Sequence, residues 1–260
     1  MNVVVELRTA DSPLGHAMLR SYFLEAKYEF LRLLRTPMFS LPTILFPVLF
    51  YLLFGVVINF GSPQAAQYLV VTYGVFGVMG AALFGFGVTV AVEREHGLLQ
   101  LKRALPMPPG AYLLAKMAMA MLFSTIVSLL LFALAIFAAG VPLAWWQWAL
   151  LLAINVLGAL PFCALGLYLG TLAGGSAAPA VVNLIFLPMA LLSGLWLPLA
   201  MLPAVFTRIA PLWPPYHLAQ VALKVVGMDA GQPLAVHLGV LAVFSVAFFV
   251  LARARLARHG

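Results

Sequence analysis

The chain has 260 residues, of which 65% are hydrophobic and only 8% are charged, and its mean hydropathy is +1.09. A typical soluble domain carries about 25% charged residues, so this composition excludes a water-soluble fold. The formal net charge of +7 rests on 14 lysines and arginines. A membrane surface accounts for this excess, so no nucleic-acid partner is needed to explain it.

Charged residues are absent from three long stretches, 36–92, 117–207 and 230–252. A spanning helix needs about 20 apolar residues, so these stretches predict two, three and one span. Their residues lack the alternation of a barrel strand, and backbone groups inside lipid must be bonded within their own segment. The predicted fold class is therefore all-α, a polytopic membrane protein with a single transmembrane domain, 1–260. The six predicted transmembrane helices are 38–58, 68–92, 111–139, 148–172, 179–197 and 234–251.

The segment before the first predicted span, 14–36, combines two kinds of residue at helical spacing. Apolar or small residues such as Phe23, Ala26 and Phe30 form one stripe, and charged residues such as Lys27 and Glu29 lie between them. This pattern predicts an N-terminal amphipathic interfacial helix, with its charged face toward the lipid headgroups.

Small residues recur at four-residue spacing along two of the predicted spans. Four-residue spacing places each set on one helix face, where helix backbones can approach closely. The predicted helix-packing residues are Gly77, Ala81 and Gly85 in one set, and Gly166, Gly170 and Gly174 in the other.

The segment 93–108, after the second predicted span, is the longest charged stretch outside the chain ends. Leu98, Leu101 and Leu105 recur at helical spacing before Pro106, which predicts a short amphipathic helix that ends at the proline. Periodicity alone fits a solvated cytosolic loop and a docking helix equally well.

Prolines cluster after the fifth predicted span, in the segment 198–217. Proline disrupts regular helix, and strongly apolar residues separate these prolines, so we predict short re-entrant or outer helices. A hydrophobic loop on the outer side is the alternative. The residues that mark this outer segment are Ser193, Gly194, Pro198, Pro203, Pro211, Pro215 and Tyr216.

The placement of lysine and arginine predicts the orientation of the chain. If both termini are cytosolic, every lysine and arginine except Arg208 and Lys224 lies inside. This is the asymmetry of the positive-inside rule, and the opposite orientation would reverse it. We therefore expect both termini in the cytosol.

Two of these segments resemble a known family, the type-2 ABC export permeases. Residues 93–108 are similar to its coupling helix, in which an element of this kind sits in a groove of a separate ATP-binding subunit and transmits its closure. The outer segment is similar to the family's progression of Ser-Gly, Pro, Leu-Pro and Pro-x-Tyr. The residues that carry the first similarity, and that the resemblance assigns to ATPase coupling, are Glu93, Arg94, Glu95, Gly97, Leu98, Leu101 and Pro106.

The resemblance implies a transport subunit and not an enzyme. Two permease subunits, identical or different, would face one another in a bacterial inner membrane, with two ABC ATPase subunits bound below them. The chain has no Gly-x-x-x-x-Gly-Lys-Ser/Thr phosphate loop, so ATP and Mg²⁺ are expected on the partner, and we expect no catalytic, cofactor or metal site here. Charge-free spans suit a hydrophobic or amphipathic cargo, such as a drug-like molecule, a lipid or a lipid-linked glycan.

An ion-coupled secondary transporter and an intramembrane enzyme are the two alternatives. An ion-coupled transporter buries ionisable groups within its spans, and we expect no such group here. Lys116 counts among the cytosolic charges, and His237 lies near the outer end of the last span, where an interfacial histidine is expected in place of a proton relay. Ser176 and Ser193 are the candidate nucleophiles of an enzyme, but small polar residues at helix ends usually serve turns and packing.

Overall fold

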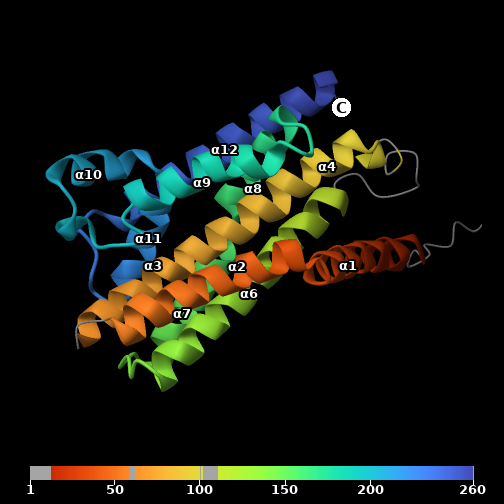
Figure 1. Ribbon diagram of the computed structural model, residues 1–260. Coiled ribbons are helices and arrows are strands. Elements are labelled where there is room, and N and C mark those ends of the chain that lie inside the picture. The colour runs from red at the N-terminus through yellow and green to blue at the C-terminus, as the bar shows by residue number, and fades with distance from the viewer. Residues whose placement is uncertain (1–12, 59–61, 100, 102–110, 260) are drawn as a thin grey trace, which may run out of the picture.

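The computed structural model describes residues 13–58, 62–99, 101 and 111–259, and every regular element in these ranges is a helix (Figure 1). The all-α prediction is thus confirmed for the described residues. The longer elements are α1 Pro13–Leu34, α2 Pro37–Phe50, α3 Pro63–Ala82, α4 Thr89–Glu95, α6 Ala111–Phe137, α7 Trp145–Leu157, α8 Ala159–Leu172, α9 Ala178–Leu192, α10 Ala204–Ile209, α11 Pro214–Val225 and α12 Leu234–His259. Two π-helical stretches, η1 Tyr51–Val57 and η2 Leu83–Val88, continue α2 and α3.

Five helices in the described part of the chain are long and apolar enough to cross a membrane. They are Pro37–Val57, Pro63–Glu95, Tyr112–Phe137, Trp145–Leu172 and Leu234–Leu256. The fifth predicted span, 179–197, differs, because α9 has only 15 residues. It ends where Gly194 adopts a φ of +74°, a left-handed conformation that glycine reaches readily and that stops a helix.

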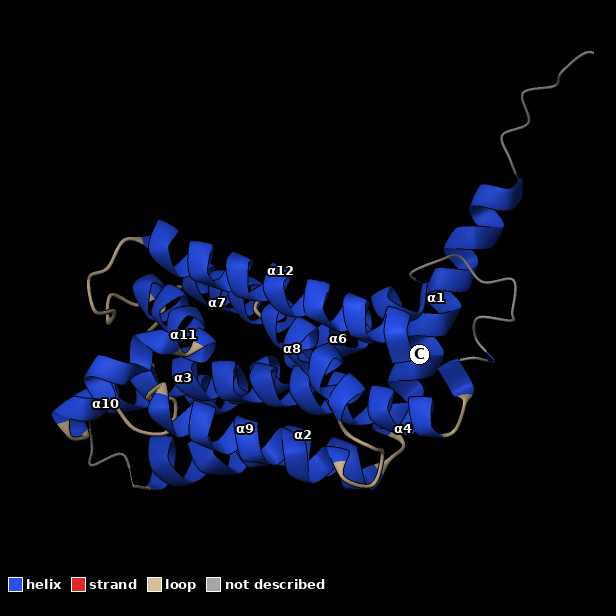
Figure 2. Ribbon diagram, turned by 90° about the horizontal axis from the view of Figure 1, so that it is seen from above, coloured by secondary structure: helices blue, strands red, loops and turns tan. Residues whose placement is uncertain are grey.

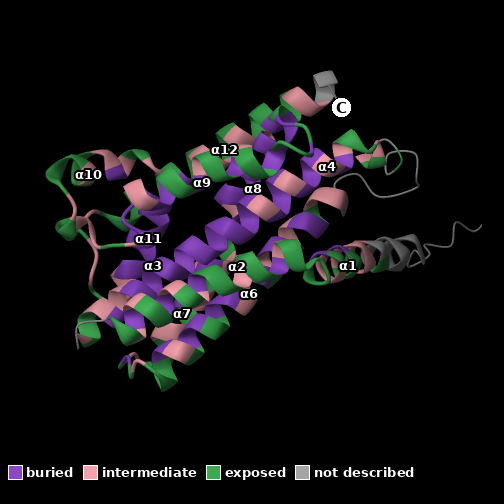
Figure 3. Cartoon of the chain, in the orientation of Figure 1, coloured by how far each residue is buried: buried purple, intermediate pink, exposed green. Residues whose placement is uncertain are grey.

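The core of the bundle runs along α3 and α8, which are buried over most of their length (Figure 3). By contrast, α2 and α12 expose large apolar side chains, among them Met38 and Val243. Lipid chains satisfy such faces as well as a protein core does, so exposed apolar helices are what a membrane bundle requires.

Close backbone contact joins α8 to η2. A Cβ added at Gly170 would lie 2.7 Å from the carbonyl oxygen of Gly87, and one at Gly166 would lie 3.1 Å from that of Ala82. Only residues without a side chain allow this approach. On the other face of α3, a Cβ at Gly77 would meet Val127 of α6 at 2.5 Å.

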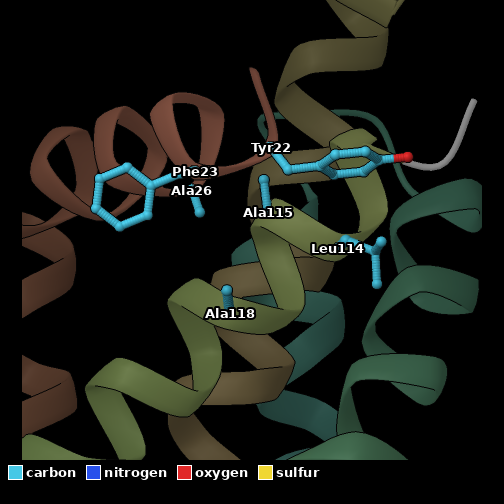
Figure 4. Close-up of a pocket in the computed structure, with 6 residues that line it drawn as sticks. All are labelled: Tyr22, Phe23, Ala26, Leu114, Ala115 and Ala118. Carbon is cyan, nitrogen blue, oxygen red and sulfur yellow. The ribbon is translucent and has the colours of Figure 1, made fainter. Parts of the chain in front are cut away.

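Helix α1 projects from the bundle beside the first turns of α6 (Figure 2). The part of α1 near α2 is anchored by Leu33 and Phe30, which pack with Met119 and Phe123 of α6. Ala81 and Phe39 complete this small apolar cluster. A groove of about 460 Å³ remains between the two helices, lined by Tyr22, Phe23, Ala26, Leu114, Ala115 and Ala118 (Figure 4).

Short helices fill the end of the bundle opposite α4 (Figure 1). Pro198 and Pro203 are the N-caps of η3 Leu199–Met201 and of α10, and Pro214 opens α11. Proline suits these positions because its φ fits a first turn and its missing N–H is not needed there. Helix α11 is largely buried, and it packs against α3, α7 and α12.

Candidate functional site

Four charged side chains meet where α1, α4 and α6 come together, three of them buried and one, Arg32, with 43% of its side chain exposed. They are Glu29 and Arg32 of α1, Glu93 of α4 and Lys116 of α6, and we call them the charge cluster. Two acids and two bases make the cluster electrically balanced, which is how proteins tolerate charges away from water.

Lys116 is the centre of the charge cluster and is fully buried. Its Nζ donates to Glu29 Oε1 at 2.5 Å, to Thr89 Oγ1 at 2.8 Å and to Glu93 Oε1 at 3.2 Å. An ammonium group has three protons, so all of them are used. The same Nζ lies 5.1 Å from the ring centroid of Tyr112, within the range of a cation–π contact.

Glu93 receives three kinds of donor and is 2% exposed. Arg32 and Lys116 donate to its Oε1, and the Tyr112 hydroxyl donates to its Oε2 at 2.6 Å. Arg32 also bonds Glu29 at 2.8 Å. Burial acts to lower the pKa of Arg32, but the carboxylates of Glu29 and Glu93 outweigh it and raise that pKa. Arg32 therefore remains charged at any physiological pH.

The next two residues of α4 attach it to the turn between α8 and α9. Arg94 donates to the carbonyl oxygens of Thr171 and Ala173, the second at 2.9 Å. Glu95 accepts from the backbone N–H of Gly175. A Cβ at Gly174 would lie 3.2 Å from the Glu95 carboxylate, so the glycine pair lets this turn approach α4.

Beyond Glu95 the chain turns outward. Gly97 has a φ of +70°, and its carbonyl accepts from the N–H of Leu101 at 3.1 Å, which starts a new helical turn. Leu98 and Leu101 are 37% and 59% exposed. Pro106 lies outside the described residues, so the predicted end of this helix stays a prediction. The described part of the segment thus presents apolar side chains at the surface next to buried charges.

The sequence is similar to those of known proteins. Residues 20–226 match the family described as ABC-2 type transporter. The chain belongs to this family. It is also 28% identical over 229 residues to the protein named "Putative transport permease YvfS" of Bacillus subtilis (strain 168), a match that covers 86% of this chain and 92% of the relative. The chain is therefore a multi-pass transmembrane subunit of an ABC transporter, and the prediction of a transport subunit in place of an enzyme is confirmed.

The structure divides the residues of this ABC-2 permease that were assigned to ATPase coupling into three groups. Glu93 is buried in the charge cluster, whereas Arg94 and Glu95 bind the turn between α8 and α9. Leu98 and Leu101 are exposed beyond the left-handed Gly97. Direct contact with a partner is open to the two leucines but not to Glu93.

The outer-segment residues lie at the opposite end. Ser193 and Gly194 end α9, and the Gly194 carbonyl accepts from the Tyr68 hydroxyl at 3.1 Å. Pro211 lies in η4 Ala210–Leu212, while Pro215 and the buried Tyr216 lie in the first turn of α11. These residues shape the chain between α9 and α12.

Two expectations about charge prove wrong. Glu29 was expected on a headgroup-facing surface, yet it is 5% exposed beneath Arg32. Buried ionisable groups were expected to be absent from the spans, yet Glu93 and Lys116 are buried in two of them. The signal in the sequence was Lys116 itself, since a lone charge within an apolar run requires a partner.

His237 was predicted to lie near the end of the last span, and it lies in the first turn of α12. The side chain is fully buried, and its Nδ1 lies 2.9 Å from Nδ1 of His217 on α11. The partner histidine follows the proline cluster of the outer segment, where the sequence drew attention to the prolines and to Tyr216.

Proposed function

We propose that this ABC-2 permease is driven by a separate ABC ATPase that docks at the α4 end of the bundle. The observation that carries the proposal is the exposure of Leu98 and Leu101 directly beyond Gly97. Apolar side chains on a short turn next to a charged helix end suit a groove in a partner protein. Burial of both leucines by the ATPase would remove apolar surface from water.

The charge cluster then transmits the motion of the docked segment. Glu93 lies within α4 and bonds to side chains of both α1 and α6, so displacement of α4 must move these helices or break buried ion pairs. Removing one partner from a buried pair costs about 3–5 kcal/mol. Movement of α1, α4 and α6 as one unit avoids this cost.

Ion coupling is the alternative source of energy, because Glu93 and Lys116 are buried ionisable groups within two spans. Each charge of the cluster is paired with an opposite one, and we propose a structural role for these pairs. Its four charged groups act as a structural joint.

The substrate we propose is hydrophobic or amphipathic, a drug-like molecule, a lipid or a lipid-linked glycan, exported from the cytosol. Apart from the charge cluster, the lysines, arginines and acids of the spans lie near their ends, at Arg94, Glu95, Arg253 and Arg255. The interior of the spans therefore offers an ionic cargo no counter-charge. ATP and Mg²⁺ would bind to the ATPase alone.

The proposed assembly has two permease subunits, identical or different, and two ATPase subunits in a bacterial inner membrane. Both termini would be cytosolic. The C-terminal end of α12, α4 and α1 lie toward one end of the bundle, and α10 and α11 lie toward the other (Figure 1). Among the described basic residues, those of α1, α4, α6 and the end of α12 belong to the α4 end, whereas Arg208 and Lys224 belong to the other. The positive-inside rule predicts this asymmetry if the α4 end is cytosolic.

The test is the ATPase activity of the permease purified with its ATPase in lipid nanodiscs. We expect Leu101→Asp to lower this activity and the amount of ATPase retained, because a charge would enter the apolar contact. Leu212→Asp is the matched control, since Leu212 is 77% exposed at the opposite end. Equal effects of the two changes, or transport by the permease without any ATPase, would refute the proposal.

A further inference from the structure

Two histidines touch inside the protein at the end opposite the charge cluster. His217 of α11 is 3% exposed and His237 of α12 is fully buried, with their Nδ1 atoms 2.9 Å apart. Their ring centroids are 5.2 Å apart. Two bare nitrogens at this distance would repel, so one of them must carry a proton.

The backbone decides which nitrogen carries it. His217 Nε2 lies 2.8 Å from the carbonyl oxygen of Pro211, which can only accept, so this Nε2 carries a hydrogen. In a neutral His217 the Nδ1 atom is then bare and accepts from Nδ1–H of His237. The remaining nitrogen, His237 Nε2, is bare and buried, and no atom of the described residues forms a hydrogen bond with it.

Three other titratable groups lie around the histidine pair, Tyr216, Lys224 and Asp229. The ring centroid of Tyr216 lies 5.3 Å from that of His217, and tyrosine ordinarily titrates near pH 10. Lys224 donates to Asp229 at 2.5 Å, and this hydrogen bond lowers the pKa of Asp229 below its ordinary value. Helix α8, which packs along α12, contains no charged residue.

We propose that His237 Nε2 is a proton-binding site, and that its occupancy loosens the contact between α11 and α12. The incoming proton comes from water at that end of the molecule and forms an N–H bond on Nε2. His237 becomes an imidazolium whose Nδ1–H still bonds His217. Its new N–H faces no acceptor, and the charge is held away from water, which disfavours the packed state.

Exposure of His237 to water would solvate its charge and its new N–H. This exposure requires α11 and α12 to separate, because hydrogen bonds hold α11 to α7 and α3. Gln147 of α7 donates to the Val225 carbonyl at 2.8 Å, and Gln67 of α3 donates to that of Val226 at 3.4 Å. Separation therefore falls between α11 and α12. A second proton on the pair would need Nδ1 of His217, which is available only after the rings part.

The choice of compartment that supplies the proton depends on the proposed function, in which both termini are cytosolic. With that orientation the proton comes from the outer side. Acid on that side would then favour an open outer end. Uptake of one proton shifts the opening equilibrium by at most about tenfold for each pH unit.

The first experiment reads the protons directly. Nitrogen-15 NMR of histidine-labelled permease in nanodiscs distinguishes protonated from bare ring nitrogens. At about pH 8 we expect His217 protonated on Nε2 and His237 on Nδ1, and at about pH 5 we expect His237 to carry both protons. A neutral His237 at both values, or one protonated on Nε2 at the higher pH, would overturn the proposal.

The second experiment measures separation of the helices. With Cys163 replaced by alanine, a cysteine at the buried Leu241, one turn from His237, is labelled with an impermeant reagent at both pH values. A cysteine at Gln232 corrects for the pH dependence of the reagent. We expect the corrected rate to rise severalfold in acid in the His96→Gln control and to stay constant in His237→Gln.

A corrected rate that does not change in the control protein, or that rises equally in His237→Gln, would refute the loosening. Neither experiment uses an ATPase or a substrate. Failure here is thus distinguishable from failure of the proposed ATP-driven transport.

Discussion

Lys116 lies in an apolar helix with its ammonium group wholly inside the protein, and its three bonds join α1, α4 and α6. Such a group is stable only while its partners stay in place, because an unpaired charge cannot be solvated there. The charge cluster therefore ties the position of α1 to that of α4.

Replacement of Lys116 by methionine should destabilise the protein by about 3–5 kcal/mol, because Glu29 and Glu93 would lose their buried cation. Reversible unfolding in mixed detergent and SDS micelles measures this. Lys224→Met is the control, since the side chain of Lys224 is 26% exposed and its pair with Asp229 should contribute at most about 1 kcal/mol. Equal losses in the two variants would contradict the account.

For individual residues, the sequence predicted that the segment 93–108 is functionally important. It did not predict which side chains pair with Glu93. Glu93 stood out because a charged stretch followed an apolar span. Its partner Arg32 lies 61 residues earlier, and no spacing rule relates a surface helix to a later span. The same holds for His217 and His237, whose contact depends on how α11 packs on α12.

Helix α8 and η2 approach one another closely, because glycines lie at their contact. The four-residue spacing of small residues predicted a packing face, and Gly166 and Gly170 do lie against η2. The identity of the neighbouring helix could not be read from the spacing, because any helix with a flat face could fill that role.

Gly170→Ala should destabilise the fold by about 1–3 kcal/mol, because the new methyl group would overlap the Gly87 carbonyl. Gly239→Ala is matched to it, a helical glycine in a span with nothing within 4 Å of the added Cβ. That change should be neutral or stabilising by up to about 1 kcal/mol. The same micelle unfolding assay compares them, and a neutral Gly170→Ala would show that α8 and η2 are not in contact.

Helix α9 shows that hydropathy alone does not predict where a helix ends. Its apolar run continues to Leu197, so length alone predicted a span of 179–197. The helix stops at Leu192 because Gly194 turns the chain, and apolarity carries no record of backbone conformation.

The outer segment should enter the lipid if its short helices are re-entrant. A cysteine at Pro203 is then expected to react more slowly with an aqueous maleimide than a cysteine at Gln232, because lipid excludes the reagent. Each cysteine is introduced into a variant in which Cys163 has been replaced by alanine. Equal rapid labelling would place the segment in water.

Across the whole molecule, the two ends have different chemistry. The α4 end carries the charge cluster and the exposed leucines, and the opposite end carries the buried histidine pair. Charge asymmetry predicted that lysines and arginines differ between the two sides of the bundle, but it predicted neither the charge cluster nor the histidine pair. The ion pairs that join α1 to α4 could not be predicted from the sequence, because they form only where three helices meet.

The central claim is that an ABC ATPase docks at Leu98 and Leu101. Its most direct test is a photo-crosslinking amino acid at Leu101 in the permease of intact cell membranes, with the same group at Leu212 for comparison. We expect only Leu101 to crosslink to a subunit that carries a Gly-x-x-x-x-Gly-Lys-Ser/Thr phosphate loop. Crosslinking of that subunit from Leu212, or from neither position, would contradict it.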